Sequence, residues 1–86
     1  MYKSDIHILR LIDYLKFEKK VSSTSDFCSE IKMQKQNISK IKKGTSHFTV
    51  QNIETICKKY NVNANWVFGI DSKVFNHKNS VEINII

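Results

Sequence analysis

Apolar residues recur every three or four positions along most of the first 69 residues, a spacing that predicts short helices with one buried face each. The clearest case is the segment from Ile6 to Phe17. Its apolar stripe follows the spacing i, i+3, i+4, i+7 and consists of Ile8, Leu11, Ile12 and Leu15. We therefore expect a first helix over residues 6–17 that packs along this stripe.

A second, short helix is expected after Ser23, whose side chain can cap the backbone N–H of Asp26. The Asp26 carboxylate would sit in the first turn, where negative charge is favoured. The inward side of this helix consists of Phe27, Cys28 and Ile31. The pattern thus predicts a helix that begins near residue 24.

Residues 32–34 are expected to form a tight turn, with Met33 as its apolar residue. A third helix is predicted over residues 35–43. Ile38 and Ile41 point inward from it, and Gly44 ends it because glycine adopts the left-handed conformation at low cost. Two helices joined by so short a turn are typical of a helix-turn-helix.

Two further helices are predicted. Residues 45–48 form a polar loop, after which Thr49 caps a fourth helix. Its core-facing residues are expected to be Val50, Ile53, Ile56, Cys57 and Tyr60. Asn63 caps a fifth helix over residues 64–68, which Gly69 ends and Trp66 packs onto the others. The predicted fold is an all-α bundle of five helices.

The pattern changes after residue 69. Residues 71–80 are polar and irregular, whereas residues 81–85 alternate apolar and polar side chains with period two, as a strand does. A lone strand is unstable, so it would pair with a second copy of the chain, with an edge of this fold or with a further domain. Otherwise it is a disordered tail. We expect a domain over residues 1–69 and a C-terminal tail or strand over residues 70–86.

Charge points to an anionic partner. The 86 residues carry a net charge of +6. Lys, Ile and Asn all have codons rich in A and T, so part of the lysine content reflects an A/T-rich coding sequence. The positions of the lysines are therefore better evidence for an anionic partner than their number. Residues 32–43 contain five lysines and no acidic residue. An ordinary solvated helix face more often mixes both signs of charge.

Several other classes are not favoured by the sequence. No stretch approaches the roughly 18 apolar residues of a membrane span, and the N-terminal region lacks the pattern of a secretion signal. Cys28 and Cys57 fall at apolar helix positions, as buried thiols in a reducing compartment do. From these features we expect a soluble, cytoplasmic protein. No metal-ligand motif and no nucleophile–base pair is recognisable, so we expect no metal, cofactor, small-molecule substrate or enzymatic activity.

The motifs occur in a particular order. They are RLIDYL at 10–15, Phe27-Cys28, Ile38-Ser39-Lys40-Ile41, Gly44, Ile53 with Ile56, and Asn65-Trp66-Val67-Phe68-Gly69. In this order and spacing, residues 8–68 resemble the phage-repressor, Cro-like helix-turn-helix family, also called lambda-repressor-like, in the form of short bacterial and prophage regulators. The sequence departs from the family at several places. Lys42 lies where the family often has an acid, and the link over residues 16–22 is a little long. Lys32 replaces the glycine of the turn, which implies positive φ at a lysine, and Gln34 is a weaker cap than Ser or Thr.

The resemblance and the helical geometry together suggest a DNA-binding surface. The third helix would enter the major groove, where Gln36 can bond adenine and lysines can bond guanine. The candidate base-reading residues are Lys35, Gln36, Asn37, Ser39 and Lys40. The candidate phosphate-binding residues are Thr24, Ser25, Lys32, Lys43, Thr45 and Ser46.

The favoured hypothesis is a sequence-specific double-stranded DNA-binding regulator, acting as a homodimeric repressor. The dimerisation candidates are Trp66, Phe68, Val81, Ile83 and Ile85. An antitoxin or a restriction-modification controller would have the same features. The alternative from another class is a protein-interaction module that pairs its C-terminal strand with a partner.

Overall fold

The computed structural model describes residues 1–76. These residues form five helices: α1 (Lys3–Phe17), α2 (Thr24–Glu30), α3 (Lys35–Lys42), α4 (Val50–Tyr60) and α5 (Ala64–Val67). Within this range the only β-type pairing is an isolated antiparallel bridge between Val62 and Phe75. The all-α class expected from the apolar spacing is thereby confirmed for the described residues. The predicted strand over residues 81–85 lies outside them.

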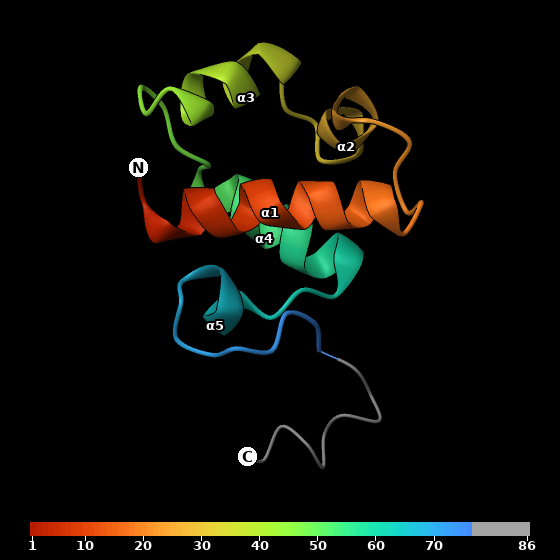
Figure 1. Cartoon of the computed structure of the whole chain (residues 1–86), viewed down its shortest axis with the longest axis vertical. Helices are drawn as coiled ribbons and strands as arrows, with labels where there is room; N and C mark the ends of the chain where they lie inside the picture. Colours follow the sequence, from red (N-terminus) through yellow and green to blue (C-terminus); the bar gives the residue numbers. More distant parts are fainter. Residues whose placement is uncertain (77–86) are drawn as a thin grey trace.

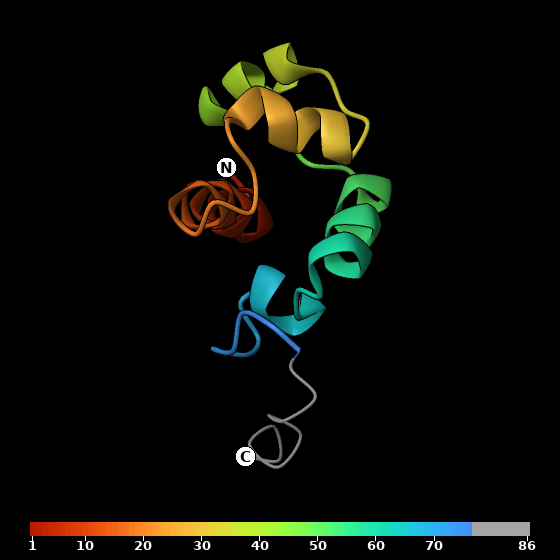
Figure 2. The ribbon, with the colours of Figure 1, turned by 90° about the vertical axis from the view of Figure 1, so that its right-hand side faces the viewer.

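α1 forms one side of the bundle, with α4 behind it in the view of Figure 1. α2 and α3 lie together on one side of α1, and α5 lies on the opposite side. Seen from the side, α1 and α4 stand opposite each other, with the α2–α3 pair across one end of the gap and α5 across the other (Figure 2). This arrangement leaves the outer surface of α2 and α3 uncovered by the rest of residues 1–76.

The core contains the apolar stripes that the spacing predicts. Ile8, Phe27, Ile41, Ile56 and Val67 are fully buried, and they come from all five helices. Burying a side chain of this size contributes about 1.5–3 kcal/mol. Packing between helices is therefore needed to stabilise α2, α3 and α5, which are too short to be stable in isolation.

The expected helix caps are present. The Asp26 N–H donates to Ser23 Oγ over 3.0 Å at the start of α2. At the start of α4, the Asn52 N–H donates to Thr49 Oγ1 over 3.0 Å. Gly44 follows α3 with φ +82°, as predicted. The short α5 is capped by the Asn63 side chain, which accepts from Asn65 N–H over 3.0 Å.

α1 begins at Lys3, three residues before the predicted start at Ile6. The cause is Asp5, whose carboxylate accepts a hydrogen bond from the Tyr2 N–H over 3.1 Å. An acid at this position satisfies a backbone donor that has no partner inside the helix. Asp5 is completely buried.

The prediction that Val50 faces the core is wrong, because its side chain is 83% exposed. The residue that is buried instead is Phe48, which the sequence placed in a polar loop. With Thr49 as the cap, Val50 is the first residue of α4 and points to solvent. An apolar residue just before a cap often packs near the fourth helical residue, which here is the buried Ile53.

The chain after α5 does not leave the body at once. Val74 and Phe75 are partly buried against the core. The Asn63 N–H donates to the Val74 carbonyl over 2.7 Å, and the Asn76 N–H donates to the Asn61 carbonyl over 2.9 Å. Residues 74–76 therefore run antiparallel to the α4–α5 link. In residues 1–76, none of the helices is both long and apolar enough to cross a membrane.

Candidate nucleic-acid interface

The turn between α2 and α3 has a defined geometry. Lys32 has φ +59°, the left-handed conformation expected from its place in the turn. The Met33 N–H donates to the Cys28 carbonyl over 2.9 Å, which ties the turn back to α2. Gln34, predicted to be a weak cap, is the N-cap residue of α3, and its side chain makes no capping bond. The turn therefore fixes the direction of α3 despite two unfavourable residue types.

α3 buries one side and exposes the other. Ile38 and Ile41 are in the core. Four of the five candidate base-reading residues are exposed, namely Lys35, Gln36, Ser39 and Lys40. Asn37 is half-buried, so its amide has less reach. The Gln36 Nε2 donates to Gln34 Oε1 over 2.8 Å, which holds the Gln36 amide over the first turn of α3.

A polar hollow of about 440 Å³ opens between the end of α1, the start of α2 and the side of α3. We call it the basic basin. It is lined by Lys16, Ser22, Ser23, Thr24, Lys35, Ile38, Ser39 and Lys42. Three lysines and four hydroxyl groups thus come together from three helices and the α1–α2 link. Ammonium and hydroxyl groups are suitable donors for a phosphate.

Lys16 is the residue that joins α1 to this basin. Its Nζ donates to Thr24 Oγ1 over 3.3 Å, and it lies 3.7 Å from a carboxylate oxygen of Asp13. The Asp13 side chain is 81% exposed, and such a surface ion pair contributes little. Sequence reasoning missed Lys16, Ser22, Ser23 and Lys42 as candidate binding residues. The local sequence has no signal for them, because the basin forms only when α1 and α3 pack beside α2.

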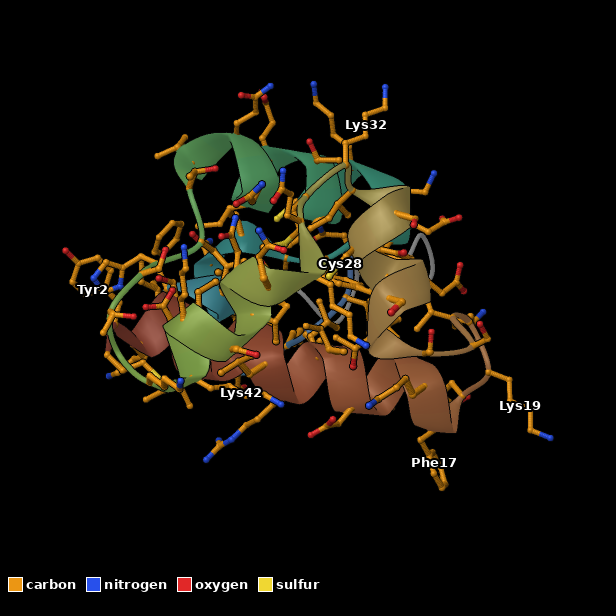
Figure 3. The ribbon with its side chains drawn as sticks, turned by 90° about the horizontal axis from the view of Figure 1, so that it is seen from above. Tyr2, Phe17, Lys19, Cys28, Lys32 and Lys42 are labelled. Atoms are coloured by element: carbon orange, nitrogen blue, oxygen red, sulfur yellow. The ribbon has the colours of Figure 1, made fainter. Side chains whose placement is uncertain are left out.

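The candidate phosphate-binding residues do not form one group. Thr24 lines the basic basin, and Ser25 is exposed beside it without lining it. Lys32 lies with residues of α4 around a different hollow, and Figure 3 shows Lys32 and Lys42 on opposite sides of the α2–α3 layer. Lys43 is exposed at the end of α3. Only Thr24 of these four belongs to the basin.

The link after α3 holds the last two phosphate candidates. The Thr45 hydroxyl donates to the Lys40 carbonyl over 3.1 Å, and the Thr45 N–H donates to the same oxygen over 2.9 Å. Ser46 is half-buried, and within residues 1–76 its hydroxyl and N–H have no hydrogen-bond partner. Of the pair, Ser46 therefore has the free donors.

The two thiols are free, and Cys28 is buried whereas Cys57 is half-buried. Burial raises the pKa of the Cys28 thiol, an effect that the nearby Lys35 ammonium partly offsets. Burial also raises the pKa of the Cys57 thiol, which is half-buried on α4. Both groups are therefore neutral at physiological pH and add no negative charge near α3.

The described dimerisation candidates differ in exposure. Trp66 is half-buried and stacks on His7 of α1 with ring centroids 5.0 Å apart, and its carbonyl accepts from His7 Nδ1 over 2.7 Å. Phe68 is 50% exposed. Val81, Ile83 and Ile85 lie outside the described residues. Trp66 thus already has a packing role within the chain, whereas half of the Phe68 surface is uncovered.

No group of three or more histidine, cysteine or acidic side chains that could hold a metal ion occurs within residues 1–76. Comparison of the chain with family models, with curated proteins and with solved structures finds no match.

Proposed function

We propose that this protein is a sequence-specific double-stranded DNA-binding regulator in which α2, the turn and α3 act as a helix-turn-helix of the lambda-repressor-like kind. The observation that carries the proposal is the basic basin beside the exposed side of α3. Lys16, Lys35 and Lys42 line it together with hydroxyl groups, and α3 has no acidic residue. A duplex offers phosphates at the rim of a groove whose floor presents hydrogen-bonding base edges.

In this proposal phosphate contacts and base contacts adjoin on α3, and Lys35 and Ser39, which line the basic basin, lie where the two meet. The basic basin binds a backbone phosphate beside the major groove and fixes the register of the protein on the duplex. Lys35, Gln36, Ser39 and Lys40 then face the base edges. Gln36 can form paired hydrogen bonds with adenine once it releases Gln34, and a lysine can donate to guanine.

The readout lacks arginine, because the single arginine of the chain, Arg10, is on α1. Bidentate arginine–guanine contacts are the commonest specific contacts in the major groove. We therefore expect modest base discrimination and a large ionic contribution. Neutralising about five to eight phosphates gives a log–log salt slope of roughly −4 to −7.

A single domain of this size reads few base pairs, so we propose that two copies bind a two-fold site as a homodimeric repressor. Phe68, with half of its surface exposed, and Trp66 are the described candidates for the interface. Selection of bound duplexes from a random pool, together with sedimentation of the free protein, tests both points. We expect a palindromic motif and a dimer. Bound duplexes that share no sequence motif would contradict base readout, and a monomer bound to a single half-site would contradict the dimer.

The second candidate is a protein-interaction module that adds its C-terminal segment to a partner as a strand. The pairing of residues 74–76 with residues 61–63 favours it, because this hydrogen-bonded stretch precedes the alternating sequence 81–85 by four residues. A chain ending at Asn76 separates the two hypotheses. DNA binding by this chain at full affinity would show that residues 77–86 serve another role, while loss of binding would link them to the DNA complex.

A further inference from the structure

Asp5 is the one charged side chain that is buried within residues 1–76, and its exposed fraction is 0%. An ionised carboxylate placed in the interior is costly unless hydrogen bonds or an opposite charge satisfy it. The groups that the buried Asp5 carboxylate holds in place therefore indicate its role.

Three donors converge on the Asp5 carboxylate. Oδ2 accepts from His47 Nδ1 over 2.6 Å and from the Tyr2 N–H over 3.1 Å. Oδ1 accepts from the Phe48 N–H over 2.9 Å. The Tyr2 ring also stacks on the His47 ring with centroids 3.7 Å apart and planes 7° apart. Two of the three donors are 42 and 43 residues away in sequence, in the link between α3 and α4.

These contacts fix one end of that link. At the other end, Thr45 is bonded twice to the Lys40 carbonyl. Ser46 is the single residue between the two fixed ends, and its hydroxyl and N–H are without a partner among the described residues. The position of two free donors next to the end of α3 is therefore set from α1 through Asp5.

We propose that Asp5 is a positioning residue for duplex binding: through His47 and the Phe48 N–H it holds Ser46 where its hydroxyl and N–H donate to a backbone phosphate. The inference rests on the proposed DNA-binding function. It assigns the phosphate contact of the α3–α4 link to Ser46 and makes Thr45 a residue that anchors the link to α3. Because these donors are uncharged, the contact adds affinity without adding released counterions.

The test compares Asp5→Asn with Glu54→Gln by duplex binding over a range of salt concentrations. Both substitutions replace an acid by its amide and raise the net charge by one, but the Glu54 side chain is 63% exposed and pairs with Lys58. An amide cannot accept all three hydrogen bonds as well as a carboxylate can. We expect Asp5→Asn to weaken binding about tenfold with an unchanged salt slope, whereas Glu54→Gln does not weaken it.

Two further measurements separate positioning from a general loss of stability. In a Ser46→Ala background, Asp5→Asn should lower the affinity for the duplex clearly less than tenfold, because the hydroxyl part of the phosphate contact that Asp5 positions is already absent. Amide hydrogen exchange of Phe48 should become faster in Asp5→Asn without DNA. If Asp5→Asn does not fold, His47→Leu, at a side chain that is 37% exposed, removes one donor and should weaken binding about threefold.

Each outcome decides the proposal. Equal affinities for Asp5→Asn and the wild type would overturn it, as would an undiminished loss in the Ser46→Ala background. Absence of duplex binding by the wild type would overturn the DNA-binding function and this inference with it, whereas a wild type that binds and an Asp5→Asn variant that binds equally well refute the inference alone.

Discussion

The Lys16 Nζ lies 3.3 Å from Thr24 Oγ1, so the last turn of α1 contacts the first residue of α2 at the basic basin. The two residues are eight positions apart and belong to different helices. Their contact places an ammonium group beside a hydroxyl group at the point where the proposed duplex backbone passes. α1 is therefore part of the proposed interface as well as part of the core.

Replacing Lys16 by glutamine is expected to weaken duplex binding and to reduce the magnitude of the salt slope by about one, because one phosphate contact loses its charge. The control is Lys58→Gln on α4, where the lysine pairs with Glu54 at 3.7 Å and does not line the basin. Binding isotherms at several salt concentrations give both values. Equal salt slopes for Lys16→Gln and Lys58→Gln would show that Lys16 makes no phosphate contact.

The exchange of roles between Phe48 and Val50 predicts opposite effects on stability. Phe48→Ala empties a buried site and should lower the free energy of unfolding by about 3–5 kcal/mol. Val50→Ala, at a side chain that is 83% exposed, should change it by no more than about 0.5 kcal/mol. Urea denaturation measures both changes. A large loss for Val50→Ala would show that α4 is rotated from its position here.

Lys32 adopts a left-handed conformation that costs an ordinary residue roughly 1–2 kcal/mol. Lys32→Gly removes this cost, while the added freedom of the unfolded chain takes back about 0.5–1 kcal/mol. We expect a net gain of up to about 1.5 kcal/mol in the free energy of unfolding. Lys20→Gly is the matched control, because Lys20 does not have positive φ, and it should be neutral or destabilising. A loss of stability in Lys32→Gly would contradict the turn geometry.

The hydroxyl group of Tyr60 is buried and lacks a hydrogen-bond partner within residues 1–76. Tyr60→Phe should therefore leave the unfolding temperature unchanged or raise it, because no bond is lost and an unsatisfied polar group is removed. The ring still stacks near Phe27, with centroids 5.9 Å apart. A marked fall in the unfolding temperature would show that the hydroxyl has a partner.

The same residue predicts an alkaline pH dependence. Burial, with smaller contributions from the Glu30 and Asp26 carboxylates, raises the pKa of Tyr60 from 10.0 to about 12. The neutral phenol therefore favours the folded state fully below pH 10, and this contribution is lost as the pH rises towards 12. Thermal unfolding across this range should show a steeper decline for the wild type than for Tyr60→Phe. Parallel curves would contradict the assignment.

The helices were predictable because their signals are local. Apolar spacing and the capping residues Ser23 and Thr49 depend on neighbours within four positions. The burial of Asp5 was not predictable, because His47 and Phe48 hold its carboxylate from across the molecule. The burial of Phe48 was missed because the polar residues around it suggested a loop. Its position directly before the N-cap residue Thr49 places its side chain in the core instead.

Only the part of the candidate site that lies on a single helix was predictable from the sequence. The outward side of α3 follows from the inward positions of Ile38 and Ile41. The basic basin needs Lys16 from α1 and Lys42 from α3 next to Thr24, and no sequence spacing indicates that meeting. Likewise, the separation of Lys32 from the basin becomes visible only once α4 is placed beside the turn.

The most direct test of the account replaces Lys35, Gln36 and Lys40 together by alanine and measures binding to the selected duplex and to a scrambled one. The control replaces Gln51, Lys58 and Lys20 by alanine, which removes the same residue types from exposed positions away from α3. We predict that the α3 variant loses its preference between the two duplexes while its unfolding temperature stays near that of the wild type, and that the control keeps its preference. An α3 variant that still prefers the selected duplex would contradict base readout by α3.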